Sequence, residues 1–130
     1  MTHKQRRVPL VLHVEDHAPA QHLRSELLRR AGCQVSDVST VQEAIDAASK
    51  QRPDVILCDV KLPDGNGFQI CREMRTLQPG VPVILISAVY REDAARQSGI
   101  FGGACDYLVE PVTPADLVAA VKRQIDFGSE

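Results

Sequence analysis

The sequence predicts an α/β fold: one domain with a doubly wound, five-stranded parallel sheet and five helices. Five apolar runs of strand length alternate with segments whose apolar residues have helical spacing. Several of these runs are continuously apolar, as strands covered on both faces of a parallel sheet require. The 130 residues are about the usual length of one compact domain, and we expect it to span residues 8–127 after a tail of residues 1–7.

The ten expected elements alternate from the amino end, beginning with a strand. The strands are expected at Val8–Val14, Cys33–Val38, Asp54–Asp59, Val81–Ser87 and Ala104–Val109. The helices are expected at Pro19–Ala31, Val41–Lys50, Phe68–Leu77 and Tyr90–Ser98, and from Pro114 onward. Crossovers between parallel strands are right-handed in nearly all proteins, and we expect the same here.

The boundaries of the first helix and of the longest predicted loop follow from local residue types. Leu23, Leu27 and Leu28 share one face of the first helix, which is therefore expected to face the core. Gly32 is a natural stop for that helix. Residues 61–67 are rich in proline, glycine, aspartate and asparagine, which predicts a loop.

Two further helices begin at residues that commonly cap helices. Thr40 and Glu43 have the spacing of a capping box, in which each side chain satisfies a free backbone amide of the other. Thr113 precedes Pro114, and proline is favoured at the first helical position. Both sites therefore predict the start of a helix.

Composition and charge exclude several classes of partner. The net charge is −2, which gives no reason to expect binding to nucleic acid or to a membrane surface. No apolar run is long enough to span a bilayer, and no signal peptide is recognisable. The spacing of the four cysteines fits neither a zinc site nor a redox motif, and we expect reduced thiols in a cytoplasmic protein. These cysteines are Cys33, Cys58, Cys71 and Cys105.

Polar side chains follow four of the five predicted strands, where the sites of such sheets form. Glu15 and Asp16 follow the first strand, Asp59 ends the third, Ser87 ends the fourth and Glu110 follows the fifth. Four carboxylates and a hydroxyl should therefore meet at one edge. Because clustered carboxylates repel one another, a cation is expected there, and carboxylate oxygens suit Mg²⁺.

Other kinds of site lack support in the sequence. No glycine-rich dinucleotide fingerprint follows the first strand, and no P-loop is present. His13 lies inside a strand, while His17 and His22 do not have the spacing of metal ligands, so packing or surface roles are expected for all three.

Several segments resemble the receiver domains of bacterial response regulators. They are LHVEDH at residues 12–17, VILCDVKLPDGNGF at 55–68, VILISA at 83–88 and GACDYLVEPV at 103–112. Their order along the chain matches the family, and the resemblance covers about residues 8–125. It implies a flavodoxin-like fold with strand order 2-1-3-4-5.

The resemblance also implies a phosphoacceptor site. Asp59 would accept a phosphoryl group from a phosphohistidine. Mg²⁺ would be bound by Glu15, Asp16, Asp59 and the backbone carbonyl of Lys61. The ion would neutralise charge and position the phosphoryl group.

The resemblance implies roles for three further residues in or near the last two strands. Ser87 would hydrogen-bond a phosphoryl oxygen and move toward the occupied site. Tyr107 would be an aromatic switch that packs inward as Ser87 moves. Pro111 would follow a cis peptide bond, which proline permits.

Glu110 is the departure from the family, which has a lysine at this position that pairs with the phosphoryl group. A charge pair at ~4 Å is worth about 4 kcal/mol at an effective dielectric of ~20, and a glutamate turns that attraction into repulsion. Glu110 could turn outward, become protonated or form a salt bridge elsewhere. Lys61 is a candidate replacement cation, and its alternative role is that of an exposed loop lysine.

The leading hypothesis is a receiver domain of a two-component phosphorelay. Its partner would be a histidine kinase or phosphotransfer protein. We expect no enzymatic turnover beyond its own phosphorylation and slow dephosphorylation. The chain ends after the last helix, so any output domain would lie elsewhere. One alternative is a pseudo-receiver that binds proteins without phosphorylation, which Glu110 favours. Another is a metal-dependent hydrolase, although the second aspartate of such phosphatases is absent, with Lys61 in its place.

Overall fold

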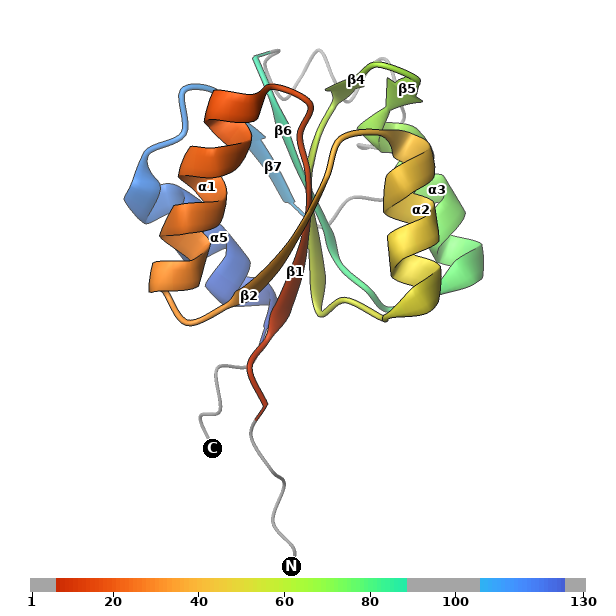
Figure 1. Ribbon diagram of the computed structural model, residues 1–130, viewed down its shortest axis with the longest axis horizontal. Helices are drawn as coiled ribbons and strands as arrows, with labels where there is room; N and C mark the ends of the chain where they lie inside the picture. Colours follow the sequence, from red (N-terminus) through yellow and green to blue (C-terminus); the bar gives the residue numbers. More distant parts are fainter. Residues whose placement is uncertain (1–6, 89–105, 126–130) are drawn as a thin grey trace, which may run out of the picture.

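A parallel sheet lies between two pairs of helices in the computed structural model, which describes residues 7–88 and 106–125 (Figure 1). The strands of this sheet are β1 (Leu10–Val14), β2 (Gln34–Val38), β3 (Val55–Asp59), β6 (Val83–Ser87) and β7 (Asp106–Val109). The helices are α1 (Ala18–Arg30), α2 (Val41–Lys50), α3 (Gly67–Leu77) and α5 (Pro114–Gln124). Helices α1 and α5 lie on one face of the sheet, and α2 and α3 lie on the other.

The sheet order is β2-β1-β3-β6-β7, and all neighbouring pairs are parallel. The α/β class and the parallel sheet are confirmed. The numbering differs from the expected 2-1-3-4-5 because two short strands, β4 (Lys61–Leu62) and β5 (Gly65–Asn66), form a separate antiparallel pair. The prediction of a plain loop over residues 61–67 was wrong in this respect. The helix expected at Tyr90–Ser98 lies outside the described residues.

Two hydrophobic clusters fill the spaces between the sheet and its helices. Alternate residues of each strand point to opposite faces, so that Leu12 belongs to the cluster beneath α2 and α3, and Val11 to the cluster beneath α1 and α5. Leu28 of α1 is fully buried in the second cluster. Burying a leucine side chain of this kind is worth about 1.5–3 kcal/mol. This packing holds the strand ends in fixed positions.

The expected helix starts at Thr40 and Thr113 are confirmed. The Thr40 side chain accepts a hydrogen bond from the Glu43 amide at 3.0 Å, and Thr113 caps α5 in the same way. The Glu43 carboxylate, however, bonds the backbone amide of Ser39 rather than that of Thr40. The carboxylate of Asp64 supplies a further cap, because it accepts from two amides in the first turn of α2.

The buried face of α1 differs from the one expected. Leu23 was predicted to face the core, but it is 60% exposed. Arg24, Ser25 and Leu28 are the buried residues of this helix. The helix is therefore turned so that Arg24 and Ser25 face the sheet beside Leu28, while Leu27 is partly buried against the same cluster.

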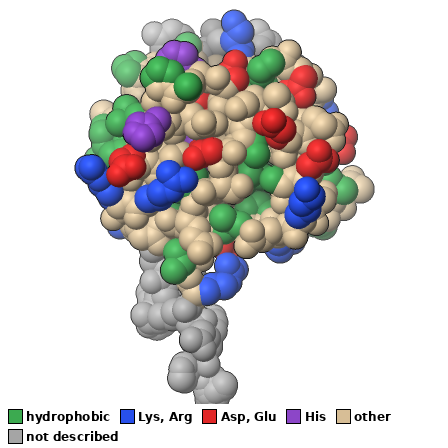
Figure 2. Space-filling view, in the orientation of Figure 1, with side chains coloured by type: hydrophobic (Ala, Val, Ile, Leu, Met, Phe, Trp, Pro, Cys, Tyr) green, Lys and Arg blue, Asp and Glu red, His purple; other side chains and the backbone are tan. Residues whose placement is uncertain are grey.

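Charged side chains of both signs are interspersed on the face of the molecule shown in Figure 2. This distribution agrees with the small net charge of −2. None of the helices in the described part of the chain is long and apolar enough to cross a membrane.

Gly67, the first residue of α3, lies against the backbone of Asp59. A Cβ atom at this position would come within 2.7 Å of the Asp59 carbonyl oxygen and equally close to Leu85. We expect Gly67→Ala to lower the free energy of unfolding by about 1–3 kcal/mol, because a well-packed site cannot absorb an added methyl group without shifting its neighbours. Urea denaturation measures the effect.

The matched control is Glu73→Ala on the exposed face of the same helix, which should change stability by less than about 0.5 kcal/mol. If Gly67→Ala is as stable as the original chain, the close packing behind Asp59 is not rigid and this prediction is wrong.

Candidate functional site

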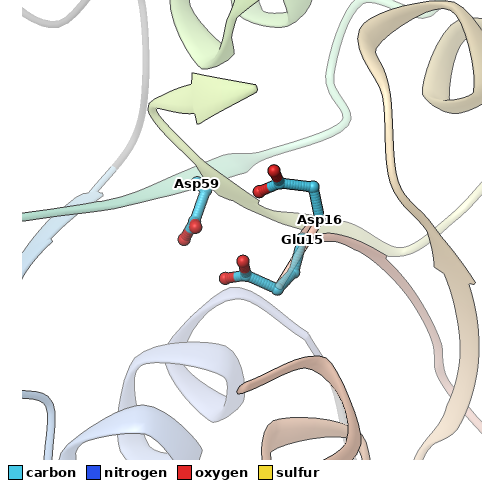
Figure 3. A group of neighbouring side chains, drawn as sticks. All are labelled: Glu15, Asp16 and Asp59. Atoms are coloured by element: carbon cyan, nitrogen blue, oxygen red, sulfur yellow. The ribbon is translucent and has the colours of Figure 1, made fainter. Parts of the chain in front are cut away.

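Three carboxylates meet where the first and third strands end. Glu15 and Asp16 directly follow β1, and Asp59 is the last residue of β3, its neighbour in the sheet. Figure 3 shows the three side chains beside one another, and each offers an oxygen within 4.8 Å of the others. Glu15 is buried, Asp59 is partly buried and Asp16 is exposed. The predicted convergence of these residues is therefore present.

Hydrogen bonds from the backbone and from α1 hold Glu15 in place. Its amide donates to the carbonyl of Val38 at 3.0 Å, and its carboxylate accepts from the amide of His17 at 2.9 Å. The side chain of Gln21 donates to the carbonyls of both Glu15 and Val38. The buried carboxylate is thus fixed at the edge of the sheet.

Arg24 of α1 places a guanidinium among these carboxylates. Its Nη1 donates to Glu15 Oε1 at 2.6 Å and to Asp59 Oδ1 at 3.1 Å, and its Nη2 donates to Glu110 Oε2 at 2.8 Å. Only 10% of the Arg24 side chain is exposed. Because arginine stays protonated in proteins, this group is a fixed positive charge inside the site.

Glu110 therefore faces the site and forms an ion pair within it. Its amide donates to the carbonyl of Ser87 at 2.8 Å, which ties the end of β7 to the end of β6. The peptide bond between Glu110 and Pro111 is cis, as the sequence predicted. Of the outcomes considered for Glu110, the structure has a salt bridge, and its partner is Arg24.

Ser87 and Lys61 lie at the same edge, whereas Tyr107 lies within β7, opposite Leu85. Ser87 and Tyr107 are both buried, and Tyr107 is part of the hydrophobic cluster beneath α2 and α3. Lys61 is exposed, and its side chain forms no ion pair with residues 7–88 or 106–125. The roles expected for Ser87, Tyr107 and Lys61 remain predictions.

The pKa values in the site reflect burial first and neighbouring charged groups second. Burial, followed by the neighbouring carboxylate of Glu15, raises the pKa of Asp59 to about 8, although Arg24 acts in the opposite direction. Burial also opposes ionisation of Glu15, but hydrogen bonds from Asp59 and from the amide of His17 outweigh it and lower the pKa of Glu15. Without a metal ion, the pKa values of the two carboxyl groups are therefore shifted in opposite directions, that of Asp59 upward and that of Glu15 downward.

The acidic group fits a hard divalent cation. Its donors are all oxygens, from two neighbouring strand ends, and one or two carboxylates completed by water and phosphate oxygens are the usual ligands of Mg²⁺. The raised pKa of Asp59 agrees with this, because burial and the neighbouring carboxylate of Glu15 both disfavour its ionised form, which a bound cation would favour. Glu15, Asp16 and Asp59 are thus the residues that would hold the ion.

The sequence did not single out Arg24. The apolar stripe of α1 placed Leu23 toward the core, and charged residues are seldom buried without a partner. Two signals were nevertheless present: Arg24 is four residues before the buried Leu28 and shares its face, and Glu110 left the acidic edge without the usual cation.

His13 has the packing role expected for it. It is fully buried, and its Nδ1 lies 3.0 Å from Asp37 Oδ1 and 3.2 Å from Ser25 Oγ. Ser25 in turn donates to the same oxygen of Asp37. The cluster joins α1 to β1 and β2 one residue away from Arg24.

A flavodoxin-like sheet with an acidic trio at the ends of its first and third strands defines the class of a signalling receiver domain. A family model described as the response regulator receiver domain matches residues 11–122. The chain therefore belongs to the response regulator receiver domain family.

Individual relatives agree with this assignment. The transcriptional regulatory protein CreB of Escherichia coli (strain K12) is 35% identical over 109 residues, which cover 84% of this chain and 47% of that protein. The DNA-binding response regulator MtrA of Mycobacterium tuberculosis (strain ATCC 25618 / H37Rv) is 31% identical over 115 residues, 88% of this chain and 50% of that protein. This chain spans about half the length of the curated relatives it matches.

A solved structure gives the same result for the fold. The crystal structure of a putative response regulator from Chloroflexus aurantiacus J-10-fl superimposes with a TM-score of 0.82 at 31% identity, covering 90% of this chain and 97% of that one.

The raised pKa of Asp59 predicts a pH dependence of stability in metal-free protein. A carboxyl group that keeps its proton in the folded state, but loses it near pH 4 when unfolded, makes the fold less stable as pH rises. Between about pH 5 and pH 8 we expect a loss on the order of 1–3 kcal/mol in chelator, allowing for screening by solvent. Urea denaturation across this range measures it.

Carboxyl groups with lowered pKa values make the fold more stable as pH rises, but this gain in stability has ended by about pH 5. Asp59→Asn should abolish the loss, whereas Asp46→Asn, at an exposed position of α2, should retain it. A loss that persists in Asp59→Asn would show that another group causes it.

Proposed function

We propose that this chain is a phosphoacceptor receiver domain, spanning residues 8–127, in which Asp59 takes a phosphoryl group from a phosphohistidine in the presence of Mg²⁺. The observation that carries the proposal is the placement of Asp59 between an acidic pair suited to a divalent cation and a buried guanidinium. Phosphoryl transfer depends mainly on such positioning and charge neutralisation.

In the proposed reaction a carboxylate oxygen of Asp59 attacks the phosphorus of the donor. An O–P bond forms as the P–N bond breaks, and the electron pair of that bond stays with the imidazole of the donor. The backbone near Asp59 is held by packing against Gly67, which keeps the nucleophile in place. Mg²⁺ bound by Glu15, Asp16, Asp59 and the Lys61 carbonyl would neutralise charge on the phosphoryl oxygens.

Ser87 and Tyr107 would transmit the modification. Ser87 ends the strand beside β3, so its hydroxyl is suited to bind a phosphoryl oxygen. Tyr107 lies opposite Leu85 in the next strand and would couple a movement of Ser87 to the outer face of β7.

The partner class follows from the same proposal. A histidine kinase or phosphotransfer protein supplies the phosphoryl group, and the reaction takes place in the cytoplasm. The names of the relatives describe a transcriptional regulator and a DNA-binding response regulator. Because this chain spans about half of each, DNA binding is proposed only for a longer protein that would contain it, not for this domain.

A pseudo-receiver is the second candidate, and Glu110 is the observation that favours it. The residue replaces the lysine expected to pair with the phosphoryl group, and its carboxylate faces the site through Arg24. A metal-dependent hydrolase is less well supported, because Lys61 stands where such phosphatases carry their second aspartate.

Incubation with an acyl phosphate and Mg²⁺ should add one phosphoryl group, seen by intact-mass spectrometry. We expect Asp59→Asn to abolish the adduct, because an amide oxygen is a poor nucleophile and retains no charge. Asp46→Asn, an exposed aspartate of α2, is the matched control and should be labelled normally.

Each alternative gives a different result. An unmodified chain that remains folded supports a pseudo-receiver, and repeated release of phosphate supports a hydrolase. An adduct that persists in Asp59→Asn would show that the acceptor has been wrongly assigned.

Mg²⁺ should stabilise the folded chain, because it relieves repulsion among carboxylates that are apart in the unfolded chain. At a hundredfold excess over Kd the free energy of unfolding should rise by about 2.7 kcal/mol. The chain has no tryptophan, so thermal melts followed by circular dichroism are the suitable measurement. Asp16→Asn should reduce the increase, and equal melting temperatures in Mg²⁺ and in chelator would contradict metal binding.

A further inference from the structure

We propose that Arg24 is the phosphoryl-binding cation of this site and that Glu110 is its positioning residue. The two side chains would together replace the lysine found at the position of Glu110 in the family. This inference rests on the proposed phosphoacceptor function and adds a residue on α1 to the machinery.

The geometry places the guanidinium where a phosphoryl group on Asp59 would need it. Nη1 of Arg24 lies 3.1 Å from Asp59 Oδ1, so the oxygens of a phosphoryl group bonded to that carboxylate would come within its reach. Three hydrogen bonds to Glu15, Asp59 and Glu110 use three of the five N–H groups of the guanidinium. The forked shape of arginine suits several oxygens of one phosphate, which a lysine ammonium meets only as a point charge.

The position of Arg24 is fixed from both sides along the helix. Gln21, one turn earlier, donates to the backbone at the ends of β1 and β2. Ser25, the next residue, is bonded to Asp37 and lies against His13. Between these anchors, Arg24 is directed at the edge of the sheet rather than at solvent.

The contact between Glu110 and Arg24 gives a reason for an acid, and not a neutral side chain, at position 110. Its carboxylate accepts from Nη2 at 2.8 Å, whereas Glu15 accepts from Nη1. A cation bound by Glu15 alone would be drawn toward the metal ligands. With Glu110 as its third partner, the guanidinium is held between the ends of β1, β3 and β7, and Nη1 donates to Asp59.

Lys61 is the competing source of positive charge. Its side chain is exposed and forms no ion pair with the residues that the structure describes, whereas Arg24 already contacts the acceptor oxygen. The losses of beryllofluoride affinity in Arg24→Ala and in Lys61→Ala therefore decide between the two residues.

The test measures binding of beryllofluoride, a stable mimic of a phosphoryl group, to the full chain with Mg²⁺ by calorimetry well below the melting temperature. Arg24→Ala should weaken binding by about 10- to 100-fold, the loss typical of a hydrogen bond to a charged group. Glu110→Gln should weaken it severalfold. Arg30→Ala, which removes an exposed arginine from the same helix, is the matched control and should leave binding unchanged.

The double variant Arg24→Ala with Glu110→Lys gives the decisive comparison. It should recover most of the binding lost in Arg24→Ala, because it restores the arrangement of the family. An arginine with only a structural role would not show this recovery in affinity, although its removal would lower the melting temperature. Arg24→Lys keeps the charge with less disturbance and should bind better than Arg24→Ala.

The outcomes separate this inference from the proposed function. If the unsubstituted chain binds no beryllofluoride and takes up no phosphoryl group, the phosphoacceptor function fails and the role of Arg24 with it. If the unsubstituted chain binds, but Arg24→Ala binds equally well or loses less than Lys61→Ala, only the role of Arg24 is overturned.

Discussion

Repulsion among the carboxylates at the edge of the sheet is the constraint on which the local structure depends. Parallel strands end at the same edge, so Glu15, Asp59 and Glu110 converge without regard to charge. A single buried guanidinium, from Arg24, contacts all three. Removing one partner of a buried ion pair commonly costs about 3–5 kcal/mol, because it leaves charge uncompensated. The placement of α1 is therefore part of the site and not only a cover for the sheet.

The rotation of α1 follows from this constraint. A stripe with Leu23 facing the sheet would gain hydrophobic area, but it would turn Arg24 away from its partners. In the structure Leu23 is exposed and Arg24 is buried. Leu28, four residues beyond Arg24, still packs in the hydrophobic cluster beneath the helix. The helix therefore keeps its apolar contact with the sheet while Arg24 lies among the carboxylates.

Residue patterns predicted the features that depend on short segments. Continuous apolar runs identified the strands, and the ends of parallel strands gave the acidic trio, because both follow from neighbouring residues. Arg24 and Glu110 are 86 residues apart, and their ion pair is a tertiary contact that periodicity does not show. For the same reason Leu23 was wrongly placed on the buried face of α1, although Leu28 is buried and Leu27 packs against the same cluster. The pairing of β4 with β5, in which Lys61 lies opposite Asn66, was also missed, because strands of two residues give no pattern among residues typical of turns.

The chemistry of phosphoryl transfer constrains the sum of charges near the acceptor more strongly than it constrains which element supplies each charge. On the proposed role of Arg24, an arginine on α1 would supply the positive charge that a lysine at the end of β7 supplies in the family. An acid at position 110 is destructive if it stands alone, because it faces a phosphoryl group of like sign. Paired with Arg24, the same acid is one of three carboxylates that hold the guanidinium, and in the proposed role it keeps Nη1 beside Asp59. If Arg24 binds the phosphoryl group as proposed, the cation of the family has moved from the end of β7 to α1, and Glu110 and Arg24 depend on each other through their ion pair.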